Sequence, residues 1–522
     1  MKKIEERKTY TNPVLPGFYP DPSICRVGED YYLVNSSFAY FPGIPIFHSK
    51  DLVHWHQIGH VLDRSSQLNL GSVGHSRGIF APTIRYNDGI FYLITTSVDG
   101  RGNFIVTSET PEGDWSDPHW LADAPGIDPS LFFDDDGQAY YTGARPSVSG
   151  ESYDGDWEIW LQEIDLEKME LQGEKYTLWK GALRDARWPE GPHIYKKDDY
   201  YYLMIAEGGT NHQHAVTVAR SKEIKGPYQG NPANPVLTHR HLGKDYPIVN
   251  VGHGDLVYTQ NKEWWMVVLA SRPYGGYYRN LGRETFLLPL IWEDGWPIMS
   301  PGSGKLEFKY RCPDLPGRRW PAEKSCDNFD GKELNYIWNS LRSSIKGSYD
   351  LNARPGYLRL YLKPEKLIEL TSPAFIGRRQ QHKNFYAVTK MEFAPEKEEE
   401  VAGLVVLQSN EYHYSLLRSS AGGKQLIRLL RCADSKETVL AEEEYSSELI
   451  YLKVEAHGQD YSFYYGRAFD ELRVLKENVD GRILSTDAAG GFVGTYIGMY
   501  ASSNNTESNN YADFDWFEYR GI

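Results

Sequence analysis

Cysteine is scarce in this chain of 522 residues. The four cysteines, whose spacing forms neither a metal-binding pair nor a dense disulfide framework, are Cys25, Cys312, Cys326 and Cys432. In a chain of this size, so few scattered cysteines indicate free thiols in a reducing compartment.

Long hydrophobic runs are also missing. The longest apolar run, Phe286 to Trp292, is too short to span a bilayer and contains Pro289. The first residues, Met1 to Lys8, are charged and lack the apolar core of a signal peptide. If the natural protein starts here, the sequence predicts a cytoplasmic protein with no membrane partner.

Basic residues are outnumbered. The chain has 56 Lys and Arg against 71 Asp and Glu, a net charge of -15, and no basic stripe. Nucleic acid is therefore not an expected partner. The abundant residues are aromatic, at 14% with 38 Tyr and 14 Trp, which suits strands and sugar-stacking sites. We expect a small neutral oligosaccharide as substrate, and a homo-oligomer is possible.

Five segments of the first 300 residues repeat one pattern. Each has a polar or small residue, a short strand, a turn and an aromatic-rich strand, and they begin at Asp21, Ala81, Asp128, Glu190 and His253. Turns such as Asn87-Asp88-Gly89 between these runs indicate hairpins. Five units of about 50 to 60 residues predict a five-bladed β-propeller. Because innermost strands surround the propeller axis, the starting residues should meet at one end, with Phe80 beside Ala81.

The repeat stops near residue 310. A stretch rich in proline, 313–324, reads as a linker, and residues 1–312 form the predicted propeller domain. In 325–522, short alternating runs without helices predict a β-sandwich. The type expected for this sandwich is a concanavalin-like jelly roll. The whole chain is thus expected to be all-β.

Glu190 has the surroundings of a general acid. Pro189 and Pro192 stiffen its segment, and Trp188 beside it should weaken solvation of the ionised form and raise the carboxyl pKa. Asp21, held between Pro20 and Pro22, is the predicted base.

Asp128, followed by Pro129, is the predicted third member, holding Glu190 and modulating its pKa. Three carboxylates at one pole of a propeller suit glycoside hydrolysis, which needs one protonated and one ionised carboxyl group.

Three motifs resemble the acidic motifs of glycoside hydrolase family 43. They are Phe18 to Ser23, Gly126 to Ser130 and Trp188 to Pro192, and the stretch Ser49 to Trp55 is also similar to that family. The resemblance covers the whole chain, because a group of the family's β-xylosidases carries a C-terminal β-sandwich of this size. It implies an inverting, exo-acting hydrolase of β-1,4-xylo-oligosaccharides or α-L-arabinofuranosyl side chains, and it supports the same three catalytic roles.

The resemblance also implies substrate contacts. Phe38 resembles an aromatic wall beside the sugar, Arg283 an arginine that bonds sugar hydroxyls, and His253 an axial histidine that in some relatives holds a water or a calcium ion. Each has a structural alternative: ordinary core, an ion pair, or a strand hydrogen bond. Phe80 stands where the xylosidases tend to have tryptophan, so the choice between xylose and arabinofuranose stays open.

No cofactor is required by these roles, although calcium is possible. A site near His253 and one formed by Asp513 and Asp515 in the last strand are the two candidates.

Two other functions are consistent with a five-bladed shape. A retaining fructosidase would need its nucleophile in an Asn-Asp-Pro context, whereas Tyr19-Pro20 precedes Asp21. A sugar-binding propeller without turnover would not need three rigid carboxylates. The site, rather than the fold, has to distinguish these functions.

Overall fold

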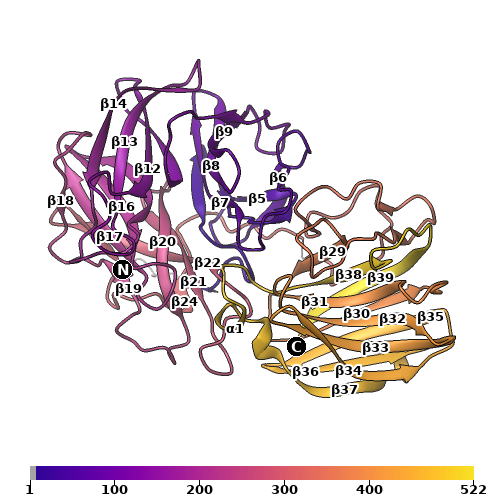
Figure 1. Ribbon diagram of the computed structural model, residues 1–522. Coiled ribbons are helices and arrows are strands. Elements are labelled where there is room, and N and C mark those ends of the chain that lie inside the picture. The colour runs from indigo at the N-terminus through magenta and orange to yellow at the C-terminus, as the bar shows by residue number, and fades with distance from the viewer. Residues whose placement is uncertain (1–7, 322) are drawn as a thin grey trace.

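The computed structural model describes residues 8–321 and 323–522, which form two β-domains (Figure 1). Residues 1–7 lie outside the described residues, as does Ala322 of the predicted linker. Residues 1–7 make up most of the charged N-terminal stretch on which the expected cytoplasmic location was based. No helix in the described part of the chain is long and apolar enough to cross a membrane.

Five antiparallel sheets radiate from one axis in the first domain. The first two sheets comprise β2 (Ser23–Val27), β3 (Asp30–Val34), β5 (Gly43–Ser49) and β6 (His56–Leu62), then β7 (Gly78–Asn87), β8 (Ile90–Val98), β9 (Gly102–Ser108) and β10 (His119–Trp120). The third comprises β11 (Ile127–Phe133), β12 (Ala139–Pro146), β13 (Trp157–Asp165) and β14 (Glu170–Trp179).

The last two sheets complete the circle. The fourth comprises β15 (Glu190–Lys197), β16 (Tyr200–Glu207), β17 (Ala215–Ser221) and β18 (Gln229–Gly230), with β19 (Leu237–Thr238) also paired to β17. The fifth comprises β20 (Val249–Tyr258), β21 (Trp264–Ser271), β22 (Glu284–Glu293) and β23 (Trp296–Met299). The innermost strands β2, β7, β11, β15 and β20 contact one another in that order, and β20 returns to β2. The five-bladed propeller predicted from the repeats is therefore confirmed.

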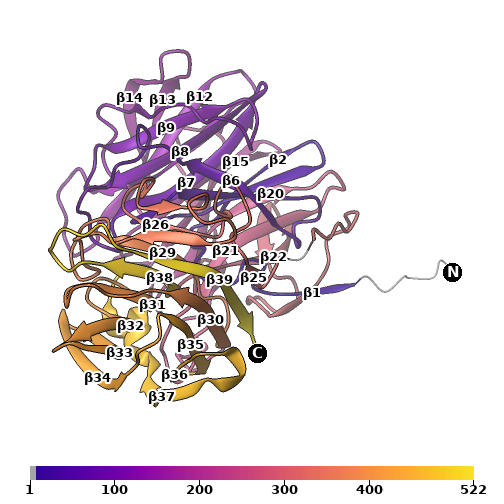
Figure 2. The same cartoon turned by 90° about the vertical axis from the view of Figure 1, so that its right-hand side faces the viewer.

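The start of the first domain is fastened to its end. β1 (Thr9–Thr11) pairs antiparallel with β24 (Lys309–Arg311), which follows the fifth blade. Figure 2 shows β1 running beside the last blade. This pairing places the first and last strands of the domain side by side.

The second domain is a sandwich of two antiparallel sheets (Figure 1). One contains β27 (Tyr349–Asp350), β28 (Leu358–Tyr361), β39 (Tyr511–Gly521), β30 (Asn384–Glu392), β35 (Leu449–His457), β36 (Asp460–Gly466) and β37 (Arg473–Asp480), with β25 (Cys326–Asp327) on β39. The other contains β29 (Ala374–Arg379), β38 (Tyr496–Ser502), β31 (Val401–Leu407), β32 (His413–Ala421), β33 (Lys424–Ala433) and β34 (Lys436–Glu444). Three one-turn helices follow β36 and β37: η1 (Phe469–Glu471), η2 (Gly481–Leu484) and α1 (Thr486–Ala489).

Side-chain alternation explains the sandwich core. In β35, Ile450, Leu452 and Val454 are buried, whereas the residues between them are only partly covered. A strand that turns alternate residues inward in this way can cover one side of a core. This is the period-two pattern from which the sandwich was predicted.

The two domains share a packed seam. β26 (Ser340–Leu341) pairs with β4 (Tyr40–Phe41) of the propeller. The rings of Tyr40 and Tyr496 stack with centroids 3.8 Å apart. Arg379 donates from Nε to the carbonyl oxygen of Phe18 at 2.7 Å, and its guanidinium lies over the Tyr19 ring, 4.4 Å from the centroid. The sandwich thus contacts the segment that leads directly into Asp21.

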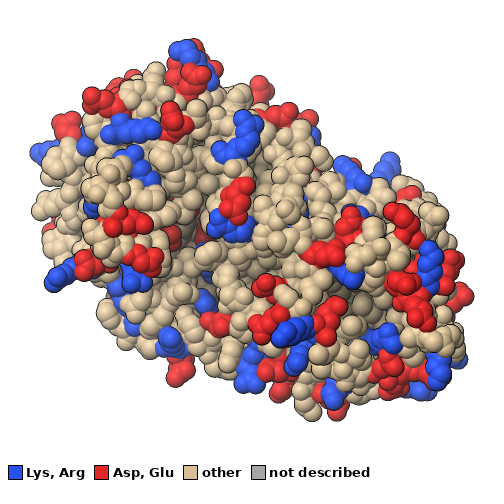
Figure 3. All heavy atoms as spheres, viewed as in Figure 1, with Lys and Arg blue, Asp and Glu red and all other residues tan. Residues whose placement is uncertain are grey.

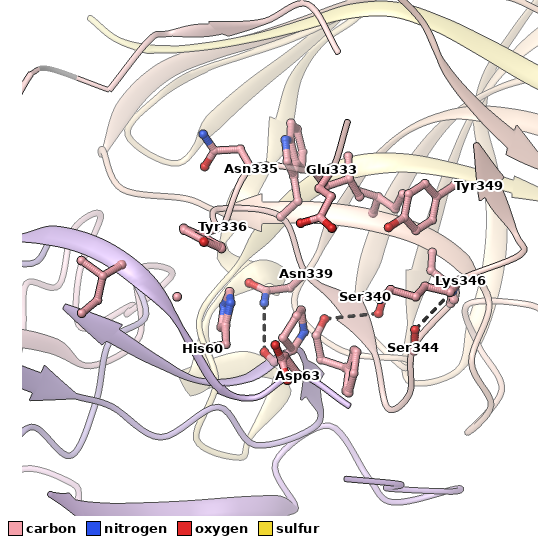
Figure 4. Close-up of a pocket in the computed structure, with 18 of the residues that line it drawn as sticks. His60, Asp63, Glu333, Asn335, Tyr336, Asn339, Ser340, Ser344, Lys346 and Tyr349 are labelled. Carbon is pink, nitrogen blue, oxygen red and sulfur yellow. Dashed lines mark hydrogen bonds between the residues drawn. The ribbon is translucent and has the colours of Figure 1, made fainter. Parts of the chain in front are cut away.

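A cleft of about 290 Å³ opens along this seam. Figure 4 shows His60 and Asp63 of the propeller facing Tyr336 and Asn339 of the sandwich across it. None of the predicted site residues lines this cleft. On the face drawn in Figure 3, basic side chains are dispersed among acidic ones and form no continuous patch.

Candidate active site

The predicted carboxylates lie at the same end of three innermost strands. Asp21 lies two residues before the start of β2, Asp128 is the second residue of β11, and Glu190 is the first residue of β15. Their charges act on one another, and those of Arg283 and His253 act on the same group. Residues that are distant in the sequence therefore meet at one mouth of the propeller axis.

Register shifts in the innermost strands redirect side chains near the site. The ladder register shifts between Phe80 and Thr83, between Ile127 and Ser130, and around residues 190–193 and 249–254. Asp128 has φ 54° and His253 has φ 46°, both in the left-handed region.

Proline fits at such bulges because it has no N–H to offer the ladder. A bulge breaks the strict two-residue alternation and redirects a side chain. Three X-Pro pairs lie within such register shifts, in β7, β11 and β15: Ala81-Pro82, Asp128-Pro129 and Gly191-Pro192.

Asp21 is buried between two donors. Arg283 Nη1 donates to Oδ1 at 2.7 Å, and the hydroxyl of Ser36 donates to Oδ2 at 2.6 Å. The Asp21 residue is 5% exposed. An ionised carboxylate is an acceptor at both oxygens, so this environment suits the charged form of Asp21.

Glu190 has the opposite environment. Its Oε1 is buried without a hydrogen-bond partner among the described residues, and no Lys or Arg side chain pairs with it there. Burial, followed by the negative charges of Asp128 and Asp21, raises the pKa of Glu190 well above its usual value, against the opposing charge of Arg283. Glu190 therefore keeps its proton to a higher pH than an ordinary carboxyl group does.

Asp128 lies between these extremes. The backbone N–H of Gly191 donates to its Oδ2 at 3.1 Å, which links it to the segment that carries Glu190. Burial raises the pKa of Asp128 to about 6; His253 opposes this rise and Asp21 adds to it. Both Asp128 and Glu190 thus ionise less readily than an ordinary carboxyl group.

Aromatic rings form a wall beside the Asp21–Arg283 pair. Phe38 and Phe80 lie with ring centroids 4.8 Å apart, and Phe492 lies 6.1 Å from each of them. The guanidinium of Arg283 lies over Phe38 at 5.6 Å and over Phe492 at 5.7 Å. Phe38 is 1% exposed, whereas Phe80 and Phe492 are half-buried, so the latter two offer more ring surface to a ligand.

Phe492 was not predicted from the sequence. It belongs to the sandwich, and no repeat or motif connects it with the propeller. It reaches the wall because the sandwich packs against the segment around Phe18 and Phe38. Only a search for aromatic residues in the loops next to the seam would have found it, and that requires the tertiary structure.

A second polar cluster on the axis was also missed. Asp255 is fully buried; its Oδ2 accepts from Ser23 Oγ at 2.7 Å and Arg85 Nη1 at 2.8 Å, and its Oδ1 accepts from Tyr195 OH at 2.6 Å. Arg85 Nη2 donates to His193 Nδ1 at 2.9 Å.

This cluster links innermost strands of four blades. Although burial alone would raise it, the pKa of Asp255 is held well below its usual range by the charge and the hydrogen bond of Arg85. Burial lowers the pKa of His193 to about 3, so His193 is neutral. The signal in the sequence was a charged residue, Arg85 or Asp255, within an otherwise apolar innermost strand.

His253 packs beneath the site. Its ring is so close to Gly191 that a Cβ on that glycine would lie 2.9 Å from Cε1. Within residues 8–321 and 323–522, no group of three or more His, Cys, Asp or Glu side chains is arranged to hold a metal. At the second calcium candidate, Asp513 pairs with Arg359 at 2.8 Å and Asp515 with Lys390 at 2.5 Å. Both carboxylates are thus neutralised by basic side chains.

A propeller with one carboxylate held by arginine and one buried carboxyl group of raised pKa at its mouth has the equipment of a glycosidase. Comparisons with known proteins agree. Residues 10–297 match the family model described as glycosyl hydrolases family 43, and residues 326–520 match the beta xylosidase C-terminal concanavalin A-like domain. The chain belongs to glycosyl hydrolases family 43.

Full-length relatives are similar throughout. A xylosidase/arabinosidase of Butyrivibrio fibrisolvens is 50% identical, with 97% of this chain and 98% of that protein covered. A non-reducing end alpha-L-arabinofuranosidase of Bacteroides ovatus is 40% identical, with 98% and 95% covered. The crystal structure of a xylan beta-1,4-xylosidase from Bacillus halodurans has a TM-score of 0.92 at 37% identity, with 98% of this chain and 100% of that chain covered. The predicted family, enzyme class and sandwich type are confirmed.

Proposed function

We propose that this protein is an inverting, exo-acting glycosidase that releases xylose, arabinose or both from xylo-oligosaccharides or arabinoxylan fragments. The names of the relatives, which include both sugars, support this substrate class. Phe80, in place of the tryptophan expected of a xylosidase, supports a pocket that is not restricted to xylopyranose. A cytoplasmic site of action, on short imported oligosaccharides, belongs to the same proposal.

Asp21 is the proposed base. It removes a proton from a water molecule, whose oxygen attacks the anomeric carbon on the face opposite the leaving group. Glu190 is the proposed acid: its O–H bond breaks, a new O–H bond forms on the glycosidic oxygen, and the bond from that oxygen to the anomeric carbon breaks. An inverting reaction of this type needs carboxyl groups roughly 6.5 to 9.5 Å apart. Asp128 is the proposed modulator of Glu190.

The observation that carries the proposal is the contrast between Asp21 and Glu190. Asp21 has a cation at 2.7 Å, whereas Glu190 is buried beside other carboxylates and without a cation of its own. Two carboxyl groups whose surroundings separate their protonation states in this way take the acid and base roles.

The test compares Glu190→Ala with wild type on aryl β-D-xylopyranosides and aryl α-L-arabinofuranosides. On a poor leaving group, loss of the acid should lower kcat/KM by about 10²–10⁴-fold. On a nitrophenyl leaving group, which departs with little help, the loss should be much smaller. Proton NMR of the first-formed sugar should show the inverted anomer. Wild type that cleaves neither glycoside, or a first product with retained configuration, would contradict the proposal.

A further inference from the structure

A buried histidine next to the proposed acid takes no part in the mechanism above. His214 directly precedes β17 and is 0% exposed. Its Nδ1 lies 3.0 Å from the backbone oxygen of Asn250. A carbonyl oxygen can only accept, so Nδ1 carries the proton of the neutral ring and Nε2 presents a bare lone pair.

That lone pair faces Glu190. His214 Nε2 and Glu190 Oε1 are 3.9 Å apart, and neither atom has a hydrogen-bond partner among the described residues although both are buried. Buried polar atoms are normally satisfied, so two unsatisfied atoms that face each other call for an explanation. The ring is also held from behind, because a Cβ on Gly252 would lie 2.5 Å from it.

The two protonation states of Glu190 meet this acceptor differently. A carboxylate would face Nε2 with a second lone pair, whereas a carboxylic acid can face it with a hydrogen. We propose that His214 is a positioning residue that acts through Glu190, accepting a hydrogen bond from its protonated carboxyl group and keeping the acid loaded for catalysis. This inference rests on the proposed role of Glu190 as general acid.

His214 holds the proton near Glu190 without taking it. Burial lowers the pKa of His214 to about 3, with its bond to Asn250 opposing, so the ring stays neutral at working pH. When the glycosidic oxygen arrives, the proton leaves the carboxyl group for that oxygen, and His214 is unchanged at the end. The other ionisable groups that act on this pair come from four further segments: Asp21, Asp128, His253 and Arg283.

A chain of contacts orients His214 from outside the site. Tyr277 donates its hydroxyl hydrogen to the side-chain oxygen of Asn250 at 2.5 Å. The Tyr277 ring lies under the guanidinium of Arg279 at 5.1 Å, and Arg279 pairs with Asp487 of α1 at 2.8 Å. Through these contacts the sandwich domain helps to hold Asn250 in place, and the backbone oxygen of Asn250 fixes the His214 tautomer.

The experiment compares His214→Asn with His214→Gln. The asparagine amide can still donate to the Asn250 oxygen but offers no acceptor to Glu190, whereas the glutamine amide can place an oxygen near the position of Nε2. The pH profile of kcat/KM is measured on a glycoside with a poor leaving group. For His214→Asn, the alkaline limb should move down by about one pH unit, a tenfold loss of rate above that limb, with KM unchanged. His214→Gln should restore most of the limb.

The inference is overturned if His214→Asn lowers activity equally at every pH, or if the glutamine variant shifts the limb as far as the asparagine variant does. Should neither variant fold, Tyr277→Phe removes the hydroxyl bond to Asn250 and leaves His214 in place. It should shift the limb in the same direction by a smaller amount, and an unchanged limb there counts against the inference. Glu190→Ala is assayed in parallel: full activity of that variant removes the proposed function, whereas its loss together with an unchanged His214→Asn profile removes only this inference.

Discussion

Substitution of Asp128 by asparagine should make the protein more stable and, at the same time, a poorer enzyme in alkaline solution. Asparagine has the same shape, and its side-chain oxygen can keep the hydrogen bond from the Gly191 N–H. What Asp128→Asn removes is the charge that burial makes unfavourable. For Asp128 the pKa shift also gives the pH range over which this negative charge develops in the folded protein.

The stability change follows from the shifted pKa. Burial raises the pKa of Asp128 from its ordinary value of 3.8 to about 6 in the folded protein, so the unfolded chain ionises first as pH rises. The folded state is therefore penalised progressively between about pH 4 and pH 6, and the full penalty applies above that. At about 1.36 kcal/mol per pKa unit it reaches about 3 kcal/mol. Asp128→Asn should unfold at a higher denaturant concentration than wild type at about pH 8 and at nearly the same one at about pH 3.5.

The activity change has its origin in repulsion. Above about pH 6 the Asp128 carboxylate opposes ionisation of Glu190, the proposed acid, and so raises its pKa. Two unit charges about 4 to 8 Å apart repel by about 2–4 kcal/mol at an effective dielectric constant of about 20. Without that charge, the pKa of Glu190 falls, and the alkaline limb of kcat/KM should move down by about 1.5 to 3 pH units.

Asp134→Asn is the matched control, since Asp134 directly follows the same strand, β11, at its opposite end. Although burial opposes it, hydrogen bonds from Lys196 and Tyr201 lower the pKa of Asp134. Loss of the Asp134 carboxylate should therefore lower the free energy of unfolding at neutral pH and leave the pH profile of activity unchanged. An Asp128→Asn variant that is less stable than wild type in mildly alkaline solution, or whose alkaline limb stays in place, would refute the reasoning.

Three further experiments probe the wall, the axis and the metal requirement. Phe492→Ala should raise KM about two- to tenfold with little change in kcat, since an aromatic contact contributes about 0.5–1.5 kcal/mol; an unchanged KM would remove Phe492 from the sugar-binding surface. Asp255→Ala leaves Arg85 buried without its counter-charge, and denaturant unfolding should show a loss of about 3–5 kcal/mol; a loss below about 1 kcal/mol would mean that the axis tolerates the unpaired charge. Dialysis against a chelator should leave the hydrolysis rate and the melting temperature unchanged, and recovery on adding Ca²⁺ would demonstrate the metal site.

The blade repeat could be predicted because each blade is a local unit. A hairpin is specified by its own turn residues and its own alternation, so Asp128-Pro129 and the aromatic pair at Tyr140 suffice to identify the third blade without knowledge of the others. The meeting of Asp21, Asp128 and Glu190 then follows from the closed geometry of five such units.

Contacts across the seam could not be predicted in this way. Phe492 lies in a loop of the sandwich, and its place in the wall depends on how two separate domains pack. The same holds for His214. No sequence pattern around it predicts a role, and only the folded chain shows that its unpaired Nε2 faces Glu190.

The sequence by itself determined the number of blades, the sandwich that follows them and the three carboxyl groups at one mouth of the propeller, because hydrophobic period, turn chemistry and X-Pro bulges act over a few residues. Only the tertiary structure decided how the surroundings of the three carboxyl groups differ. Burial, the Arg283 pair of Asp21 and the missing cation at Glu190 all depend on residues brought together from distant strands, and electrostatic energies depend on distance in space and exposure to water rather than on position in the chain.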